Sequence, residues 1–200
     1  MASLLSQSNL HTSQYKLEPI KKTSFTHLIY TQDDLDNVTD VINYSENNSY
    51  HVILLYAHGS DDSKLTDTLK TIKNNESRNY IFLDQFNEMI KLARKKNVKI
   101  CLIAISCFWN KKYDINFGAN KTLLKPTLTF GSYKTTRLPY PIQRLINKIN
   151  DLPSDFDHQF IESWLFSLKD EFDNYMSLVS NFNFEKNAYD EPGEYHIIYE

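Results

Sequence analysis

The stretch HVILLYAHGS (residues 51–60) indicates the fold of this chain. Its first seven residues form a nearly continuous apolar run, which stops abruptly at His58-Gly59. Such short runs are typical of strands that are buried on both faces, as in a parallel sheet covered by helices. A second run of the same kind, VKICLIAIS (98–106), ends directly before Cys107.

Strand-like and helix-like segments alternate along the rest of the chain. The runs FTHLIY (25–30), TLLKPTLTFGS (122–132) and YHIIY (195–199) predict further strands, the second interrupted near Pro126 and the last at an edge. A short helix and a polar loop are expected within 64–80. Apolar residues at helical spacing predict longer helices over 33–44, 83–97, 140–151 and 155–180. This alternation predicts an α/β fold, with a mostly parallel sheet flanked by helices on both faces in three layers.

Acidic residues mark the predicted starts of two helices. Asp33 and Asp34 stand at the beginning of the 33–44 helix, and Asp84 is a candidate N-cap of the 83–97 helix. Carboxylates are favourable at these positions because they accept hydrogen bonds from free N–H groups and complement the helix dipole. The two boundaries are therefore expected at these aspartates.

The composition limits the class of protein. With 200 residues, 41% of them hydrophobic, the chain is expected to form a single domain over 21–200, after a flexible leader of residues 1–20. The net charge is −3, and no basic run or aromatic-basic stripe indicates nucleic-acid binding. Cys101 and Cys107 lie in one apolar segment, which favours reduced thiols in the cytoplasm over a disulfide framework.

Several classes of site are not indicated by the sequence. No apolar segment is long enough to span a membrane, and residues 1–14 lack the pattern of a signal peptide. The His, Cys, Asp and Glu residues do not cluster at metal-ligand spacing, and no glycine-rich phosphate loop is present. We therefore expect neither a metal ion nor another cofactor.

His58 and Cys107 follow two strands that are predicted to be parallel neighbours. Ligands of open α/β sheets bind beyond the carboxyl ends of the strands, so both side chains are expected at one edge. A neighbouring imidazole activates a cysteine because it lowers the thiol pKa or accepts the thiol proton. The N–H groups of Gly59 and Cys107 are candidates for an oxyanion hole. Cys101, inside the strand, is expected to be a core residue.

The two strand ends carry a resemblance to a known group. VILLYAHGS (52–60) and KICLIAISC (99–107) resemble the caspase-like (clan CD) cysteine peptidases, most closely the bacterial CHAT-type branch. That branch has an apolar strand ending in His-Gly and a later strand ending in a small residue plus Cys. The intervening YIFLDQFNEMI (80–90) is similar to the same branch, so the resemblance covers about residues 50–108.

The resemblance implies a cysteine endopeptidase that cleaves a protein or peptide substrate with a His-Cys dyad and no cofactor. His58 would be the base and Cys107 the nucleophile, with Gly59 helping to form the oxyanion hole. Such domains in bacteria often belong to defence systems, including antiviral ones, or to signalling systems, and a protein partner activates them. The chain departs from caspases after the nucleophile, where Phe108-Trp109 stands and no glycine follows.

Substrate preference is predicted from residues beside the expected site. In the caspase-like group, the loop after the first strand often contributes to the pocket for the residue before the scissile bond. An acidic pocket favours Lys or Arg in the substrate, whereas Lys134 and Arg137 would favour an acidic residue. The candidate substrate-binding residues are Asp33, Asp34, Asp61, Ser106 and Ser132.

Two other functions stay open at this point. A non-catalytic interaction module with the same fold would have Phe108 and Trp109 filling the pocket. A serine hydrolase would use Ser60 or Ser106, although the sequence has no G-x-S-x-G elbow. The dyad hypothesis requires both catalytic side chains on one face of the sheet, close enough to share a proton.

Overall fold

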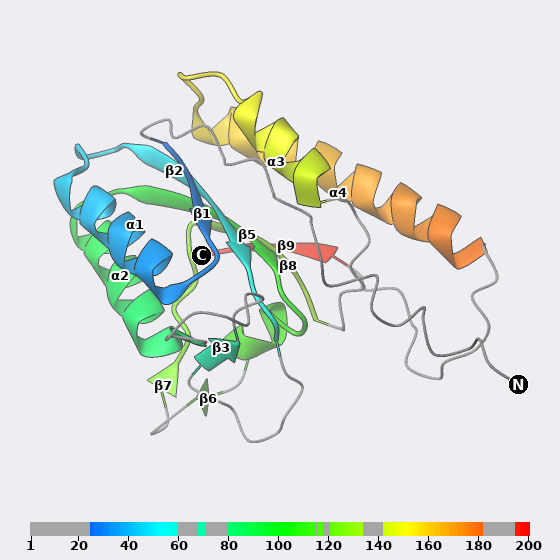
Figure 1. Cartoon of the computed structure of the whole chain (residues 1–200). Helices are drawn as coiled ribbons and strands as arrows, with labels where there is room; N and C mark the ends of the chain where they lie inside the picture. Colours follow the sequence, from blue (N-terminus) through cyan, green and yellow to red (C-terminus); the bar gives the residue numbers. More distant parts are fainter. Residues whose placement is uncertain are drawn as a thin grey trace, which may run out of the picture.

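A mostly parallel five-stranded sheet forms the centre of the protein (Figure 1). In spatial order its strands are β1 (Thr26–Ile29), β2 (Tyr50–Tyr56), β5 (Lys99–Ile105), β8 (Leu128–Ser132) and β9 (Tyr195–Tyr199). The first four run parallel, and β9 pairs antiparallel with β8. The computed structural model describes residues 25–59, 68–70, 80–114, 116–117, 121–133, 142–181 and 195–200, with no side chains for residues 70, 117 and 174–181.

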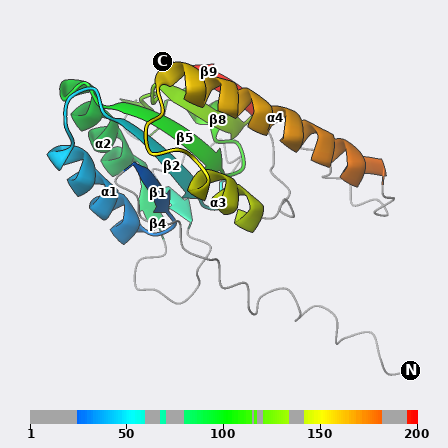
Figure 2. The same ribbon diagram turned by 90° about the horizontal axis from the view of Figure 1, so that it is seen from above.

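Helices cover both faces of the sheet, as the view from above shows (Figure 2). One face carries α1 (Gln32–Tyr44) and α2 (Leu83–Lys95), and the other carries α3 (Ile142–Asn150) and α4 (His158–Asn181). Ile53 packs into one core with Phe86 of α2, and Val52 packs into a second core with Leu165 of α4. The prediction of an α/β fold with helices on both faces is confirmed.

The two central strands are buried because apolar side chains leave both of their faces. Along β2, Val52 and Leu54 belong to the core under α3 and α4, whereas Ile53 and Leu55 belong to the core under α1 and α2. Each of these four side chains is 0% exposed. A strand that alternates between two cores has no solvent face, which explains why the sequence shows no polar alternation there.

The helix boundaries differ from the sequence prediction in one instructive case. The N-cap of α1 is Thr31, and the side chain of Asp34 completes a capping box with it. The predicted N-cap of α2, Asp84, is wrong: the N-cap is Phe82, which makes no side-chain cap hydrogen bond. Asp84 lies inside the first turn and pairs with Lys121 at 3.0 Å, so its carboxylate is held by an ion pair near the helix N-terminus.

Two small antiparallel hairpins accompany the sheet. The first joins β3 (Thr68–Lys70) to β4 (Tyr80–Phe82), and the second joins β6 (Asn116–Phe117) to β7 (Lys121–Thr122). Within the segment 64–80, where a short helix and a polar loop are expected, residues 68–70 form β3 through pairing with β4. The interruption predicted near Pro126 is confirmed, because β8 starts at Leu128.

Some sequence predictions fall on residues that are not described. These are the leader 1–20, residues 64–67 and 71–79, Ser60, Asp61, Lys134 and Arg137. Within the described ranges, no helix combines the length and apolar character needed to cross a membrane.

Candidate functional site

The pairing of β2 with β5 leads His58 and Cys107 to the same edge of the sheet. Tyr56 lies opposite Ile105 in the parallel register, and the Ala57 N–H donates to the Ile105 carbonyl oxygen at 3.3 Å. His58 and Cys107 each come two residues after this last pair, so both lie beyond the carboxyl ends of β2 and β5. We call the edge formed by these strand ends the carboxyl edge.

The alternation of the two strands assigns their last residues to one face. Tyr56 and Ile105, two positions before His58 and Cys107, both belong to the core under α3 and α4. β5 ends at Ile105 and Cys107 lies in the turn that follows it, so strand alternation assigns a face to Tyr56 and Ile105 only. His58 is exposed and Cys107 is half-buried, whereas Ser106 between the strand and Cys107 is 1% exposed. The register brings the ends of β2 and β5 to one edge of the sheet, and the same-face requirement of a dyad stays a prediction.

Gly59 has a structural reason to be glycine. A Cβ atom at this position would lie 1.8 Å from the Cys107 carbonyl oxygen and 2.7 Å from Ser106 Oγ. The backbone of Cys107 therefore packs directly against Gly59. This contact fixes the end of β2 against the segment that follows β5.

Trp109 lies in the core and not in the site. Its side chain is 0% exposed, meets Phe86 edge-on at 5.4 Å between ring centroids, and donates from Nε1 to Tyr113 Oη at 2.9 Å. The chain reaches this position because Phe108 has a φ of 56°, a left-handed conformation that is uncommon outside glycine. Trp109 thus belongs to the core under α1 and α2. An interaction module with Trp109 filling the pocket does not fit this placement.

Cys101 and Ser106 are both enclosed. Cys101 is 0% exposed within β5, and burial raises the pKa of its thiol, so its prediction as a core residue is confirmed. Ser106 Oγ is buried, and it has no hydrogen-bond partner in the part of the chain that the structure describes. A serine nucleophile needs contact with a base, so Ser106 is a poor candidate for that role.

Three of the candidate substrate-binding residues differ in their surroundings: Asp34 is engaged in hydrogen bonds, Asp33 is exposed and Ser132 is buried. The Asp34 carboxylate accepts hydrogen bonds from the N–H of Tyr30 at 3.0 Å and from the N–H and hydroxyl of Thr31 at 2.8 Å each. Asp33 is exposed at the start of α1. Ser132 is 0% exposed at the carboxyl end of β8, opposite Tyr195 of β9. Asp34 is therefore occupied by the helix cap.

A pair of tyrosines beside the site was missed by sequence reasoning. Tyr30 and Tyr56 stack with their ring centroids 5.7 Å apart and their planes 23° apart. Burial raises the pKa of Tyr56, and the neighbouring Tyr30 raises it further. Both residues end neighbouring strands in register, since Ile29 lies opposite Leu55. The one sequence feature that could have predicted this pair is that each tyrosine lies at the end of a predicted strand.

A lysine near the site is also buried. Lys112 lies in the 3₁₀ helix η1 (Asn110–Tyr113), is 4% exposed, and has its pKa lowered by burial. The neighbouring Asn110 is 0% exposed and donates to the Gly131 carbonyl oxygen at 2.9 Å, which ties η1 to β8. The segment after Cys107 is thus packed onto the sheet.

A metal site is not indicated by the side chains. Among the described residues, no three or more His, Cys, Asp or Glu side chains gather in a way that could hold a metal ion. No protein-family model matches the chain, and no curated protein matches it either.

Proposed function

We propose that this chain is a cysteine peptidase of the caspase-like class, with His58 and Cys107 as its catalytic dyad. One relationship supports the proposal above all: the register of β2 and β5 leads both residues to the carboxyl edge, with Gly59 against the Cys107 carbonyl oxygen. The exposed His58 and the half-buried Cys107 are accessible from solvent, as a substrate-binding pair requires.

The dyad performs peptide hydrolysis in two steps. Cys107 Sγ attacks the carbonyl carbon and forms a C–S bond, while His58 takes the thiol proton and passes it to the amide nitrogen as the C–N bond breaks. Water then attacks the thioester and gives a proton to His58, and the C–S bond breaks to release the acid. In both steps the N–H groups of Gly59 and Cys107 stabilise the negative oxygen.

Substrate preference in this proposal depends on Asp33 and Asp61, since Asp34 is held by the helix cap. A peptide library in which the residue before the scissile bond is varied over all amino acids tests this preference. Cleavage after Lys or Arg is expected. Activation by a protein partner in a bacterial defence or signalling system is part of the same proposal. It predicts that the isolated chain reacts with thiol probes but turns substrate over slowly until that partner is added.

A thiol-labelling experiment tests the dyad directly. A chloroacetamide probe is added to the wild type, His58→Ala, Cys107→Ser and His158→Ala, and the labelled residue is identified by mass spectrometry. His158 serves as the matched control because it lies at the start of α4, away from the carboxyl edge. Labelling of Cys107 should slow by about tenfold or more in His58→Ala alone, the lower range for loss of a general base. Equal labelling in the wild type and His58→Ala would instead support a non-catalytic module.

A further inference from the structure

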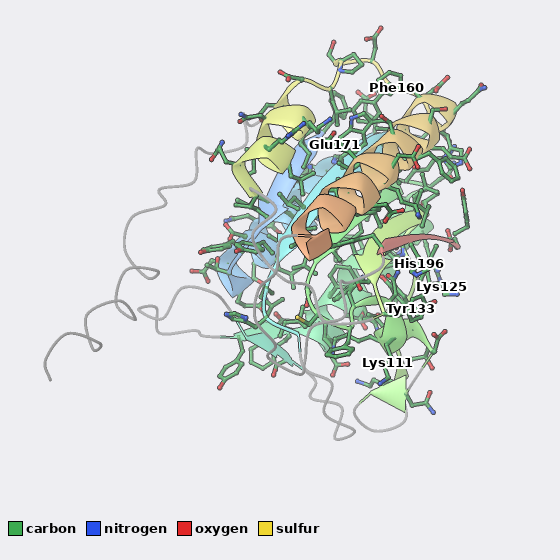
Figure 3. The ribbon with its side chains drawn as sticks, turned by 90° about the vertical axis from the view of Figure 1, so that its right-hand side faces the viewer. Lys111, Lys125, Tyr133, Phe160, Glu171 and His196 are labelled. Carbon is green, nitrogen blue, oxygen red and sulfur yellow. The ribbon has the colours of Figure 1, made fainter. Side chains whose placement is uncertain are left out.

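Two hollows lie at the edge of the sheet opposite the candidate site. They measure about 370 and 340 Å³, and both are lined by Lys99, the first residue of β5. We call this the amino edge, because the starts of β2 and β5 lie there. Figure 3 labels Lys125, which lines the larger hollow. Nothing in the proposed peptidase mechanism uses the amino edge.

The larger hollow is positively charged. Arg94, Lys99 and Lys125 line it together with one carboxylate, that of Glu200. Arg94 contacts the Glu200 carboxylate at 2.6 Å and donates to the Lys125 carbonyl oxygen at 3.0 Å. Within the described residues, the amines of Lys99 and Lys125 form no ion pair. The hollow therefore already accommodates one carboxylate and keeps two cations available for others.

The smaller hollow combines three aromatic residues with polar ones, among them Asp157, whose carboxylate accepts from the Phe160 N–H at 2.7 Å. Phe156 meets Phe25 and Tyr50 edge-on, with ring centroids 6.4 and 5.9 Å apart, and all three line the hollow. The Tyr50 hydroxyl lies 3.2 Å from His158 Nδ1, so the polar end of this tyrosine is satisfied within the wall. Such a hollow suits an apolar or aromatic side chain.

We propose that the amino edge binds an acidic segment of a partner protein. An aromatic or large apolar residue of that segment enters the smaller hollow, and neighbouring carboxylates lie against Lys99 and Lys125. Charge complementarity supports an acidic partner, and the Arg94–Glu200 contact is an example of it within the chain. Single-stranded nucleic acid is the competing occupant, because the basic hollow adjoins aromatic residues on which a base could stack, and labelled RNA tests it below.

Fluorescence anisotropy with labelled peptides tests the proposal. The probes are rhodamine-labelled peptides that combine Phe with Glu at varied spacings, and matched peptides in which Lys replaces Glu. Lys99→Glu reverses the charge that the two hollows share, so binding of the acidic peptides should weaken by about tenfold or more. Lys91→Glu is the control, since Lys91 lies on α2, is exposed and lines neither hollow.

The outcomes separate binding from folding and from catalysis. Thermal unfolding of Lys99→Glu should match that of the wild type, because this side chain is exposed. Acidic peptides should bind the wild type and Lys91→Glu alike, and the affinity should fall as salt rises. The proposal is overturned if no acidic peptide distinguishes wild type from Lys99→Glu, or if labelled single-stranded RNA binds more tightly than every peptide. Neither result depends on the reactivity of Cys107.

Discussion

Gly59 and Cys107 are in backbone contact, and a Cβ atom at residue 59 would lie 1.8 Å from the Cys107 carbonyl oxygen. This contact joins residues that are far apart in the sequence, at the point where β2 and β5 both end. The site therefore depends on backbone packing as much as on the two side chains that we assign to chemistry.

Substitution of Gly59→Ala should disturb that contact. A backbone carbonyl cannot rotate away as a flexible side chain can, so the strand ends must separate, at a cost of about 1–3 kcal/mol in the free energy of unfolding. Labelling of Cys107 should slow in the same variant. Denaturant unfolding and thiol labelling measure the two effects. If Gly59→Ala matched the wild type in both, the close contact would be contradicted.

The two cysteines should differ sharply in reactivity. In the native protein an alkylating probe should modify Cys107 and leave Cys101 unmodified, because Cys101 is 0% exposed and burial raises its thiol pKa. Both should react once the chain is unfolded in denaturant. Mass spectrometry of digested samples counts each site, and fast native labelling of Cys101 would show that β5 opens.

Trp109→Ala should be among the most destabilising single substitutions in the chain. The side chain is fully buried against Phe86, and its removal leaves a cavity as well as an unpaired Tyr113 hydroxyl. A loss of about 3–5 kcal/mol in the free energy of unfolding is expected for Trp109→Ala. Trp109→Phe keeps part of the packing and should lose less. A small loss for Trp109→Ala would contradict its placement in the core.

Asp34→Ala should lower the free energy of unfolding and leave the substrate preference nearly unchanged. The Asp34 carboxylate closes the capping box with Thr31, so its removal should cost about 1 kcal/mol in the free energy of unfolding. Asp33→Ala, one residue earlier and exposed, should leave stability nearly unchanged. Selection between Lys, Arg and other residues in a peptide library should follow Asp33 rather than Asp34. A loss of selection in Asp34→Ala at full stability would reverse this assignment.

The protein should lose stability when the pH falls from 6.5 to about 4. His27 Nε2 lies 2.8 Å from His51 Nδ1 between β1 and β2, and burial lowers the pKa of each to about 4, with the charge of His51 lowering that of His27 further. The unfolded chain binds protons at these residues from pH 6.5 downward and the folded chain does not, so unfolding becomes easier, by an amount on the order of 3 kcal/mol for each histidine.

His27→Phe provides the comparison for this pH effect. It removes one titrating group and keeps a ring beside His51, so the decrease in unfolding free energy between pH 6.5 and about 4 should become smaller. Denaturant titrations at both ends of that range measure the difference between the two proteins. Equal pH dependence in wild type and variant would exclude the histidine pair as its source.

The apolar runs predicted the central strands well, because a strand between two cores needs hydrophobic residues on both faces. Helical spacing likewise located the four α-helices of the described residues to within a few residues. The sequence could not indicate the β3–β4 hairpin, whose strands are short and depend on pairing with each other. It also could not place Trp109, because its path into the core depends on the left-handed backbone of Phe108. The Tyr30–Tyr56 stack and the shared role of Lys99 arise from register between distant strands, which local patterns do not encode.

The parallel pairing of β2 with β5 also has a consequence for folding kinetics. Parallel neighbours are joined by a long crossover, here containing β3, β4 and α2, so the pairing is a contact between distant parts of the chain. Contacts of this kind form slowly because a large loop must close first. During synthesis, β2 emerges well before β5, and in that interval His58 has no cysteine at the same edge. A nascent or partly folded chain would therefore carry a separate histidine and thiol, and the dyad would exist only after the sheet has assembled.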